Sequence, residues 1–195
     1  MKTLAVTGGI GSGKSVVCRY LESKGIPVYD SDSRTRRLYD FYPELLKRVE
    51  EEFGCEFRAE NGFLDRKKLA AVVFGDKSAL ALLESIVHPY AYNDFVDWRR
   101  TRPSGTELVV IESAIILQKP LFRPLADKII MVEAPFEDRI RRVCMRDGVD
   151  REAVIKRMEA QNYDMQSVDA VILNDCDEQT LKARVDEVLG VIWNK

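Results

Sequence analysis

The sequence predicts an α/β fold built on an open parallel sheet, and three observations support this prediction. Short apolar runs typical of buried strands alternate with longer runs whose apolar residues recur at helical spacing. Helices separate the predicted strands, as parallel strands require. A glycine-rich turn joins the first strand to the first helix. The chain has 195 residues, of which 46% are hydrophobic, and this length fits one domain with insertions.

Five apolar runs are predicted to form the sheet, and turn residues flank them. The strands are expected at residues 2–7, 26–29, 107–111, 127–132 and 169–174. Four helices are expected beside them, at residues 13–24, 135–147, 150–161 and 178–193. Because the strands are apolar on both sides, we expect helices to cover both faces of the sheet.

A mostly helical stretch separates the second strand from the third. One set of apolar residues with helical spacing comprises Leu38, Leu45, Leu46, Val49 and Phe53. A second stripe, on a long helix, comprises Leu82, Leu83, Ile86 and Tyr90. The hairpin-like "RAENGF" lies between the two, and "RPSGT" ends the stretch. Pro89 lies inside the long helix and is expected to kink it, because proline removes a backbone hydrogen bond.

The composition argues against several classes of protein. The 30 basic and 32 acidic residues nearly balance, so no nucleic-acid partner is predicted. No apolar run approaches the ~20 residues of a membrane span, and the N-terminus lacks the apolar core of a signal peptide. We therefore expect a cytoplasmic protein without a membrane partner. With one histidine and no paired cysteine spacing, zinc is not expected. The cysteines, expected to be thiols, are Cys18, Cys55, Cys144 and Cys176.

The glycine-rich turn "GGIGSGKS" matches the phosphate-binding pattern G-x-x-x-x-G-K-[ST], from Gly8 through Gly13 to Lys14 and Ser15. A strand precedes it and a helix follows, as this motif requires. Glycines let backbone N–H groups wrap a phosphate, and the helix N-terminus adds its dipole. Lys14 would reach the β- and γ-phosphates, and the Ser15 hydroxyl would ligate the Mg²⁺ that ATP carries. The motif therefore predicts a nucleotide site with Mg²⁺.

The motif indicates a nucleotide but no particular reaction, because GTPases, ATPases and small-molecule kinases share it. The guanine-reading string N-K-x-D and the switch string D-x-x-G are both absent. A GTPase is therefore not favoured, and the reaction must be inferred from residues further along the chain.

Two aspartates follow the second predicted strand. Asp30 and Asp32 lie in "VYDSD", at the strand end where open α/β sheets form their ligand crevice. A carboxylate there could accept a proton from an attacking hydroxyl group. Asp also caps helices well, and for Asp30 this explanation is equally good. Asp32 lies further into the expected helix, so the catalytic interpretation is favoured for it.

Arg139, Arg142 and Arg146 are spaced by three and four residues and so share one stripe of a predicted helix. The opposite stripe is predicted to be buried and comprises Phe136, Ile140, Val143 and Cys144. Arginines near phosphates can neutralise a transferring phosphoryl group. Considered alone, however, the stripe is better explained as a solvated face paired with the acidic residues 137–138. His88, beside the long helix's apolar stripe, is expected to be structural or to contact substrate.

Five segments follow one another along nearly the whole chain: "LAVTGGIGSGKS", "GIPVYDSD", "LDRKKLAAVVFGDKSALALLESIVHPY", "RVCMRDGVDREAVIKRMEAQ" and "VILND". Together, and in this order, they resemble the dephospho-coenzyme A kinase family. The most specific element of the resemblance is "LESIVHP" after "LAAVVF". The resemblance implies ATP-dependent phosphorylation of the 3′-hydroxyl of dephospho-CoA, the last step of coenzyme A synthesis.

The resemblance also implies an architecture. It is a P-loop NTPase core with a parallel five-stranded sheet, similar to nucleoside-monophosphate kinases, with a helical substrate-binding insertion and a mobile lid. The core is expected at residues about 1–34 and 104–195, the CoA-binding insertion at about 35–103, and the lid at about 139–162. Oligomeric state does not follow from the sequence.

Carried over residue by residue, the resemblance implies the following sites. The ATP-binding residues would be Gly8, Gly11, Ser12, Gly13, Lys14, Ser15, Val16 and Asn174, the last of which lies where the family contacts adenine. Lys14, Asp32, Arg142 and Arg146 would be catalytic, with Asp32 as the base and the two arginines on the lid. Asp32, Arg66 and His88 would contact dephospho-CoA.

The sequence departs from the family at one segment. The family usually has Pro-Leu-Leu-Phe-Glu after the third strand, where this chain has Ala114 to Gln118. The proline and the acid are both absent, so the role of that glutamate in binding Mg²⁺ or substrate cannot be transferred. Glu112 is the nearest remaining acid and could serve through water. Residue 16 is Val where Thr is common, and we expect little effect.

Two other functions remain open from the residues. Another small-molecule or nucleotide kinase would share the P-loop, the aspartates and the lid, and would differ in the helical insertion. A nucleotide-sensing protein would bind ATP without turnover, and Asp32 and the lid arginines argue against it. A panel of acceptor substrates distinguishes these alternatives.

Overall fold

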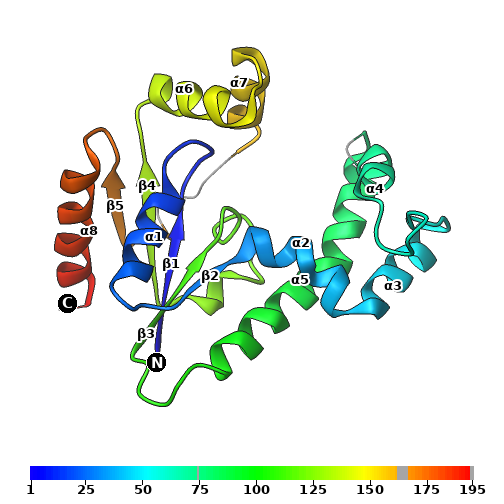
Figure 1. The fold of residues 1–195 in the computed structure, drawn as a ribbon, viewed down its shortest axis with the longest axis horizontal. Helices are drawn as coiled ribbons and strands as arrows, with labels where there is room; N and C mark the ends of the chain where they lie inside the picture. Colours follow the sequence, from blue (N-terminus) through cyan, green and yellow to red (C-terminus); the bar gives the residue numbers. More distant parts are fainter. Residues whose placement is uncertain (74, 162–166, 194–195) are drawn as a thin grey trace. The chain divides into compact units, whose positions relative to one another are not determined.

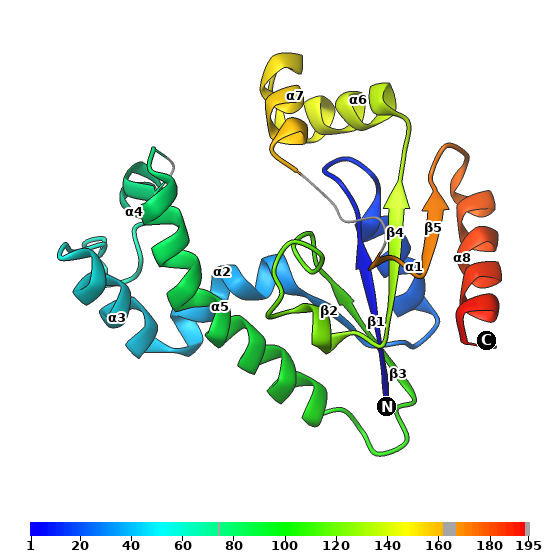
Figure 2. The ribbon, with the colours of Figure 1, turned by 180° about the vertical axis from the view of Figure 1, so that it is seen from behind.

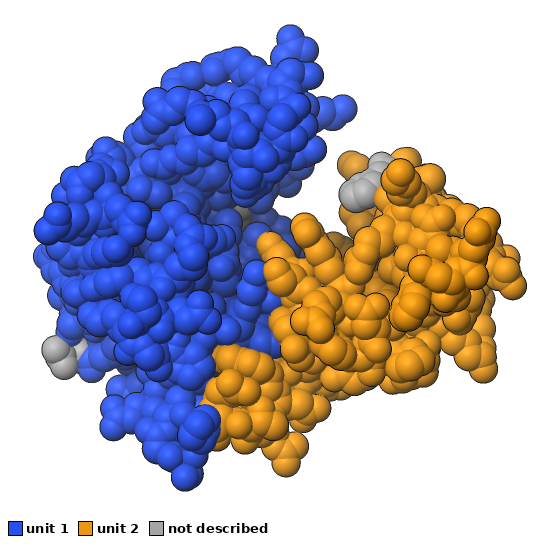
Figure 3. All heavy atoms as spheres, viewed as in Figure 1, with its two compact units in different colours: residues 1–30, 103–195 blue, residues 31–102 orange. Residues whose placement is uncertain are grey.

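The computed structural model describes residues 1–73, 75–161 and 167–193. The chain divides into two compact units, coloured separately in Figure 3. Unit 1 comprises residues 1–30 and 103–195 and contains the sheet, and unit 2 comprises residues 31–102 and is mainly helical. None of the described helices combines the length and apolar character needed to cross a bilayer.

The sheet of unit 1 has five strands, all parallel, in the order β2-β3-β1-β4-β5 (Figure 1). Their bounds are β1 Lys2–Thr7, β2 Val28–Asp30, β3 Leu108–Glu112, β4 Lys128–Glu133 and β5 Ala170–Leu173. The predicted fold class is thus confirmed. Because all strands are parallel, their carboxyl ends share one edge, and ligands of open α/β sheets bind beyond that edge.

The second strand begins later than the predicted residue 26. Pro27 has no backbone N–H and cannot donate to a sheet ladder. Its carbonyl still accepts a hydrogen bond from Val110 N at 2.9 Å, but regular pairing begins only at Val28. The strand therefore ends at Asp30, whose partner across the β2–β3 ladder is Glu112.

Helices α1 and α8 pack over the sheet of unit 1, and their apolar faces join one core (Figures 1 and 2). The helices of this unit are α1 Lys14–Ser23, α6 Phe136–Asp147, α7 Arg151–Glu159 and α8 Glu178–Trp193, with a short 3₁₀ turn η1 at Arg123–Leu125. The buried residues of this core include Leu4, Val17, Leu21, Ile130 and Val185. Burying such side chains contributes about 1.5–3 kcal/mol each, so this core holds β1 and the start of α1 in place.

Helices α6 and α7 have a small core of their own, formed by Ile140, Val143, Val154 and Met158. Cys144 is partly buried against it. Phe136 is 49% exposed, so its predicted place on the buried stripe is wrong. It is the first residue of α6, one turn before Ile140, and it borders a small hollow beside Gly9 instead.

Unit 2 consists of α2 Ser31–Phe41, α3 Pro43–Phe53, α4 Arg66–Val73 and α5 Lys77–Arg100. Pro89 lies inside α5, and the helix bends along its length in Figures 1 and 2, as predicted. A single antiparallel bridge, Arg58 to Leu64, closes the predicted hairpin-like turn. Leu82 is 36% exposed, so it does not belong to the buried stripe; Ile86 does.

A buried ion pair joins α2 to α5 in unit 2. Arg34 donates two hydrogen bonds to Asp94, from Nε to Oδ2 at 2.9 Å and from a terminal nitrogen to Oδ1 at 2.6 Å. Asp94 is only 4% exposed, so its charge depends on this bidentate partner. Because Arg34 lies in the first turns of α2, the pair fixes the segment that also carries Asp32.

Two aspartates hold the amino ends of the strands together. Asp127 N–H donates to Thr3 O, and Thr3 N–H donates back to Asp127 Oδ2 at 2.6 Å. Asp169 repeats this arrangement with Ile129, whose N–H donates to Oδ2 at 2.8 Å, and also pairs with Lys128 at 2.8 Å. Each carboxylate thus fixes the register of the neighbouring strand, at the end opposite the predicted ligand edge.

Asp169→Asn should lower the melting temperature by up to about 4 °C at pH 7, because Asn keeps an oxygen for Ile129 N–H but loses the charge that pairs with the partly exposed Lys128, a pair worth about 1 kcal/mol or less. Burial alone would raise the pKa of Asp169, but hydrogen bonds from Lys128 and Ile129 N–H outweigh it, so that pKa lies below the ordinary value for Asp. A depressed pKa gives stability that is present above about pH 4 and is lost as the pH falls through the folded-state value. The difference in melting temperature between the unmodified protein and Asp169→Asn should therefore shrink below about pH 4. A difference that is the same at pH 3 as at pH 7 would contradict this.

Candidate active site

The turn at residues 8–13 has a backbone that only glycine adopts without strain. Gly8, Gly11 and Gly13 have φ angles of 145°, 77° and 98°. A Cβ on Gly8 would lie 2.2 Å from the Val132 carbonyl oxygen. The two constraints, positive φ and close approach, explain the glycines of the motif. They let the turn fold tightly between β1 and α1, as a phosphate-wrapping loop requires.

The N-terminus of α1 is suited to an anion. Its N-cap is Gly13, which has no side chain to cap the helix, and the first turn holds no acidic residue. The first N–H groups of a helix and its dipole favour a negative ligand. Ser12 is 1% exposed, and its hydroxyl has no hydrogen-bond partner among the described residues. The turn thus carries a buried polar group that a bound phosphate could satisfy.

Lys14 folds back over the turn. Its Nζ donates to Gly8 O at 2.7 Å and to Gly9 O at 3.3 Å. The positive charge is therefore held at the mouth of the loop, where the motif places the β- and γ-phosphates. Val16, two residues on, packs its side chain against the core of the sheet.

Ser15 and Glu112 bring two oxygen ligands together at the carboxyl edge of the sheet. Ser15 Oγ donates to Glu112 Oε1 at 2.7 Å. Glu112 ends β3, next to β1, and Asp30 lies opposite it at the end of β2. The nearby Cys18 thiol has a raised pKa, chiefly because it is buried and secondarily because of the Glu112 charge. Hydroxyl and carboxylate oxygens suit Mg²⁺, so these residues fit the ion that ATP carries.

The two aspartates after β2 fall on different units. Asp30 is the last residue of β2, in unit 1, and immediately precedes α2. Asp32 lies in the first turn of α2, in unit 2, and is exposed. Asp30 therefore has both the helix-preceding position expected of a cap and a place beside Glu112. Asp32 has an accessible carboxylate at the start of an anchored helix.

Two of the three arginines of the α6 stripe contact the P-loop. Arg139 Nε donates to Ile10 O at 2.9 Å. Arg142 donates to Gly11 O at 3.4 Å and to Asn174 O at 3.2 Å. Arg146 instead pairs with its neighbour Asp147. The alternative of a solvated face is therefore wrong for Arg139 and Arg142 but describes Arg146, which is exposed. The acids at residues 137–138 pair with Arg151 and Arg141.

Asn174 follows β5 and donates a hydrogen bond to the P-loop. It is 6% exposed, and its amide nitrogen donates to Ser12 O at 2.8 Å. Its backbone N–H donates to Glu133 O at 2.7 Å, so the residue is fixed to the end of β4. The structure thus gives Asn174 a direct contact with the P-loop; a contact with adenine stays a prediction.

Arg66 and His88 line one cavity inside unit 2. Its volume is about 310 Å³, and the other lining residues include Arg36, Tyr39 and Val87. Burial raises the pKa of Tyr39 to about 12. Arg66 also donates to the backbone carbonyl of Arg36. The two residues expected to contact dephospho-CoA are therefore brought to the same mostly apolar hollow, from α4 and α5.

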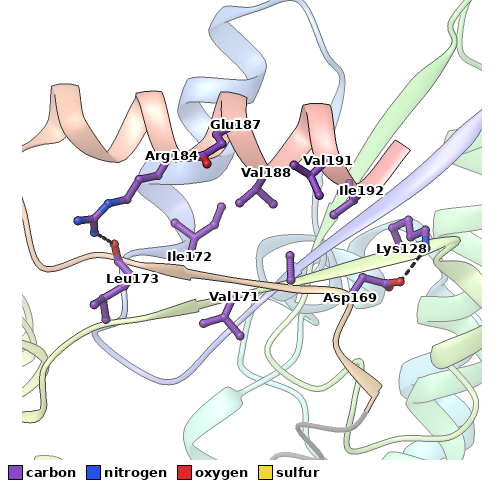
Figure 4. Close-up of a pocket in the computed structure, with 11 residues that line it drawn as sticks. Lys128, Asp169, Val171, Ile172, Leu173, Arg184, Glu187, Val188, Val191 and Ile192 are labelled. Atoms are coloured by element: carbon purple, nitrogen blue, oxygen red, sulfur yellow. Dashed lines mark hydrogen bonds and ion pairs between the residues drawn. The ribbon is translucent and has the colours of Figure 1, made fainter. Parts of the chain in front are cut away.

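A larger hollow of about 510 Å³ lies between β5 and α8 (Figure 4). Ile172 of the strand and Val188 and Ile192 of the helix line it. The Lys128–Asp169 pair borders one end, and Arg184 bonds to Leu173 O at the other. None of the predicted site residues lines this hollow, so its size is unrelated to the predicted chemistry.

Several contacts were not predicted from the sequence. Ile10 and Gln161 were not singled out, although the Ile10 N–H donates to Gln161 Oε1 at 2.8 Å. Arg139 was predicted only as one member of a stripe. One signal was available: Gly9 and Gly11 exceed what the motif requires, which indicates that another segment approaches the loop closely.

Comparison with known proteins agrees with this geometry. The family model for dephospho-CoA kinase matches residues 2–179. A dephospho-CoA kinase of Porphyromonas gingivalis is 43% identical over 161 residues, which cover 83% of this chain and 78% of that protein. One from Corynebacterium glutamicum is 33% identical over 196 residues, covering 98% of this chain and all of its own length.

Solved structures show the same fold. A Thermus thermophilus protein superimposes with a TM-score of 0.80 at 33% identity, covering 97% of this chain and 96% of its own. A shikimate kinase of Acinetobacter baumannii, 13% identical, reaches a TM-score of 0.52 over the whole of this chain and 94% of its own, and this likeness concerns the fold alone. From the family model and the relatives, the chain belongs to the dephospho-CoA kinase family and is an enzyme that phosphorylates dephospho-CoA.

Proposed function

We propose that this kinase transfers the γ-phosphoryl group of ATP to the 3′-hydroxyl of dephospho-CoA, giving coenzyme A and ADP, with the P-loop of unit 1 holding ATP. The observation that carries this proposal is the strand–turn–helix at residues 2–23. Its glycine-only backbone, uncapped helix start and inward-folded Lys14 form a site for a polyphosphate. The cytoplasm is the proposed location.

The residues of unit 1 act on the donor. The backbone N–H groups of the loop and the start of α1 bind the phosphates, and Lys14 neutralises the β- and γ-phosphates. Ser15 and Glu112 would hold Mg²⁺, which when bound neutralises charge on the phosphate oxygens. The family has a glutamate where this chain has Gln118, which carries no charge. Glu112 would take over the role of that glutamate. Support for this is the 2.7 Å contact between Ser15 and Glu112.

The acceptor, dephospho-CoA, is proposed to bind unit 2, including the first turn of α2. Asp32 would accept a hydrogen bond from the 3′-hydroxyl and orient it for in-line attack, taking up its proton as the bond to phosphorus forms. Arg66 and His88 would contact dephospho-CoA, and the cavity that they share supports this role. The helical insertion of residues 35–103 would therefore select the acceptor, while the core of residues 1–34 and 104–195 carries the P-loop.

Helices α6 and α7 are proposed as the lid. A kinase must keep water away from the γ-phosphoryl group, and a closing segment that bears arginines does so while stabilising charge. Arg142 and Arg146 would meet the transferring group, and the contact of Arg142 with the P-loop supports the first of these roles. Residue 162, the expected end of the lid at about 139–162, lies outside the described residues.

The proposed reaction is tested by measuring ADP release with and without dephospho-CoA, and by weighing the product with mass spectrometry. We expect ADP release to depend on dephospho-CoA and the product to gain one phosphoryl group. Transfer to another acceptor only would favour a different small-molecule kinase, and ATP binding without turnover would indicate a sensor.

Lys14→Ala should abolish phosphoryl transfer, because the charge of Lys14 neutralises the phosphates. The circular dichroism spectrum should stay unchanged, because this charge does not stabilise the core. Near-normal turnover by Lys14→Ala would refute the P-loop assignment.

Asp32→Asn should lower kcat by about 10²–10³-fold, the lower half of the range for general-base assistance, because phosphoryl transfer needs little proton transfer at its transition state. ATP affinity should hardly change, because the P-loop is untouched. Asp30→Asn is the matched control: Asn also caps helices well, so a stability loss of about 1 kcal/mol or less and most activity are expected. Measuring kcat and melting temperature for both variants shows whether Asp32 or Asp30 acts as the base. Loss of activity in Asp30→Asn alone would assign the base to Asp30.

Arg66→Ala and His88→Ala should each raise the KM for dephospho-CoA more than the KM for ATP. Both side chains line the cavity of unit 2, whereas the P-loop belongs to unit 1. Loss of a charged hydrogen bond costs about 1.5–3 kcal/mol, so a rise of at least about tenfold is expected for Arg66. Steady-state kinetics with each substrate varied in turn provides the measurement. Equal effects on both substrates would point to a general folding defect.

A further inference from the structure

The backbone of Ile10, at the tip of the P-loop, is held through both its N–H and its carbonyl by the segment that follows β4. Its N–H donates to Gln161 Oε1 at 2.8 Å, just beyond the end of α7. Its carbonyl accepts from Arg139 Nε at 2.9 Å, in the first turn of α6. The two consecutive peptide groups that flank Ile10 are thus bonded to the two ends of the α6–α7 segment. Both bonds join residues far apart in the sequence.

The side chain of Ile10 makes a third connection. It packs against the core of the helix pair, formed by Ile140, Val143, Val154 and Met158. This core is separate from the core that buries β1 and α1. Ile10 therefore belongs to the P-loop by its backbone and to the α6–α7 core by its side chain.

The glycines on either side of Ile10 make this contact possible. A Cβ on Gly9 would lie 2.1 Å from a terminal nitrogen of Arg139, and a Cβ on Gly11 would lie 2.5 Å from the Arg139 carbonyl oxygen. Cβ contacts under 3.0 Å essentially never occur, so a side chain at position 11 would push the backbone of α6 away, and one at position 9 would displace the Arg139 guanidinium. The sequence Gly-Ile-Gly therefore serves the docking of α6, in addition to the turn of the loop.

We propose that Ile10 is a positioning residue that couples the α6–α7 lid to the P-loop, so that the lid arginines and the phosphate-binding peptides keep one geometry. This inference rests on the proposed ATP site. Ile10 does not contact the reacting atoms; it acts through Arg139 and Gln161. When phosphate fixes the loop, the connection transmits that order to α6 and α7, and a disordered lid in turn loosens the loop.

Ile10→Ala tests the coupling because it removes the apolar contact while keeping both backbone hydrogen bonds possible. We expect kcat/KM for ATP to fall about tenfold and the KM for dephospho-CoA to stay within about twofold. Ile10→Val, which keeps a branched apolar side chain, should restore kcat/KM to within about twofold of the unmodified protein. Ile155→Ala is the matched control, because Ile155 packs against the same core from α7. Ile155→Ala should lower the melting temperature but leave kcat/KM for ATP close to that of the unmodified protein.

Amide hydrogen exchange over residues 136–161, with and without ATP, gives a readout that a merely structural role would not move. In the unmodified protein and in Ile155→Ala, ATP should slow exchange in this segment; in Ile10→Ala it should not, even when ATP saturates the site. The same ATP-dependent protection in Ile10→Ala would overturn the proposal, as would an equal kinetic loss in Ile155→Ala. Calorimetric titration with ATP alone keeps this test separate from the identity of the acceptor.

Discussion

The binding of phosphate by backbone N–H groups is the constraint on which the rest of the structure depends. Such a site needs a turn that side chains cannot occupy, and Gly8, Gly11 and Gly13 provide it with φ angles that other residues rarely adopt. It also needs a rigid support on each side, which β1 and α1 supply from one buried core. The parallel order of the sheet then brings Asp30 and Glu112 to the same edge as the turn.

Charges of opposite sign are sorted around this turn. Lys14, Arg139 and Arg142 all donate hydrogen bonds to carbonyl groups of the loop, which places three cations around one peptide segment. The acids Asp30 and Glu112 lie at the strand ends, where Ser15 donates a hydrogen bond to Glu112. In the proposed donor site, a polyphosphate would turn its oxygens toward the cations and its metal ion toward Glu112. This separation of charge would give the nucleotide one favourable direction in the proposed site.

Much of the fold could be predicted because its signals are local. The strand at residues 2–7, the motif after it and the alternation of elements each need only neighbouring residues, and the structure confirms the parallel five-stranded sheet. Phe136 and Leu82 were misplaced because helical spacing gives a face but does not say where the neighbouring helix ends. The contacts of Ile10 with Gln161 and of Ser15 with Glu112 join residues far apart in sequence. A single sequence carries no direct signal for such pairs.

The position of unit 2 within the chain has a consequence for folding. All of its residues lie between β2 and β3, two strands that pair directly in the sheet. Forming that pair means closing a very long loop, and the entropy of closure opposes it. The helices of unit 2, however, contact one another within residues 31–102: α2 packs on α3, and α2, α3 and α4 pack on α5. Helical units of this kind form faster than sheets built from distant strands. A unit 2 that folds early would already have ordered this connection, so that the part of the chain assigned to the acceptor also lowers the entropy lost when β2 and β3 pair.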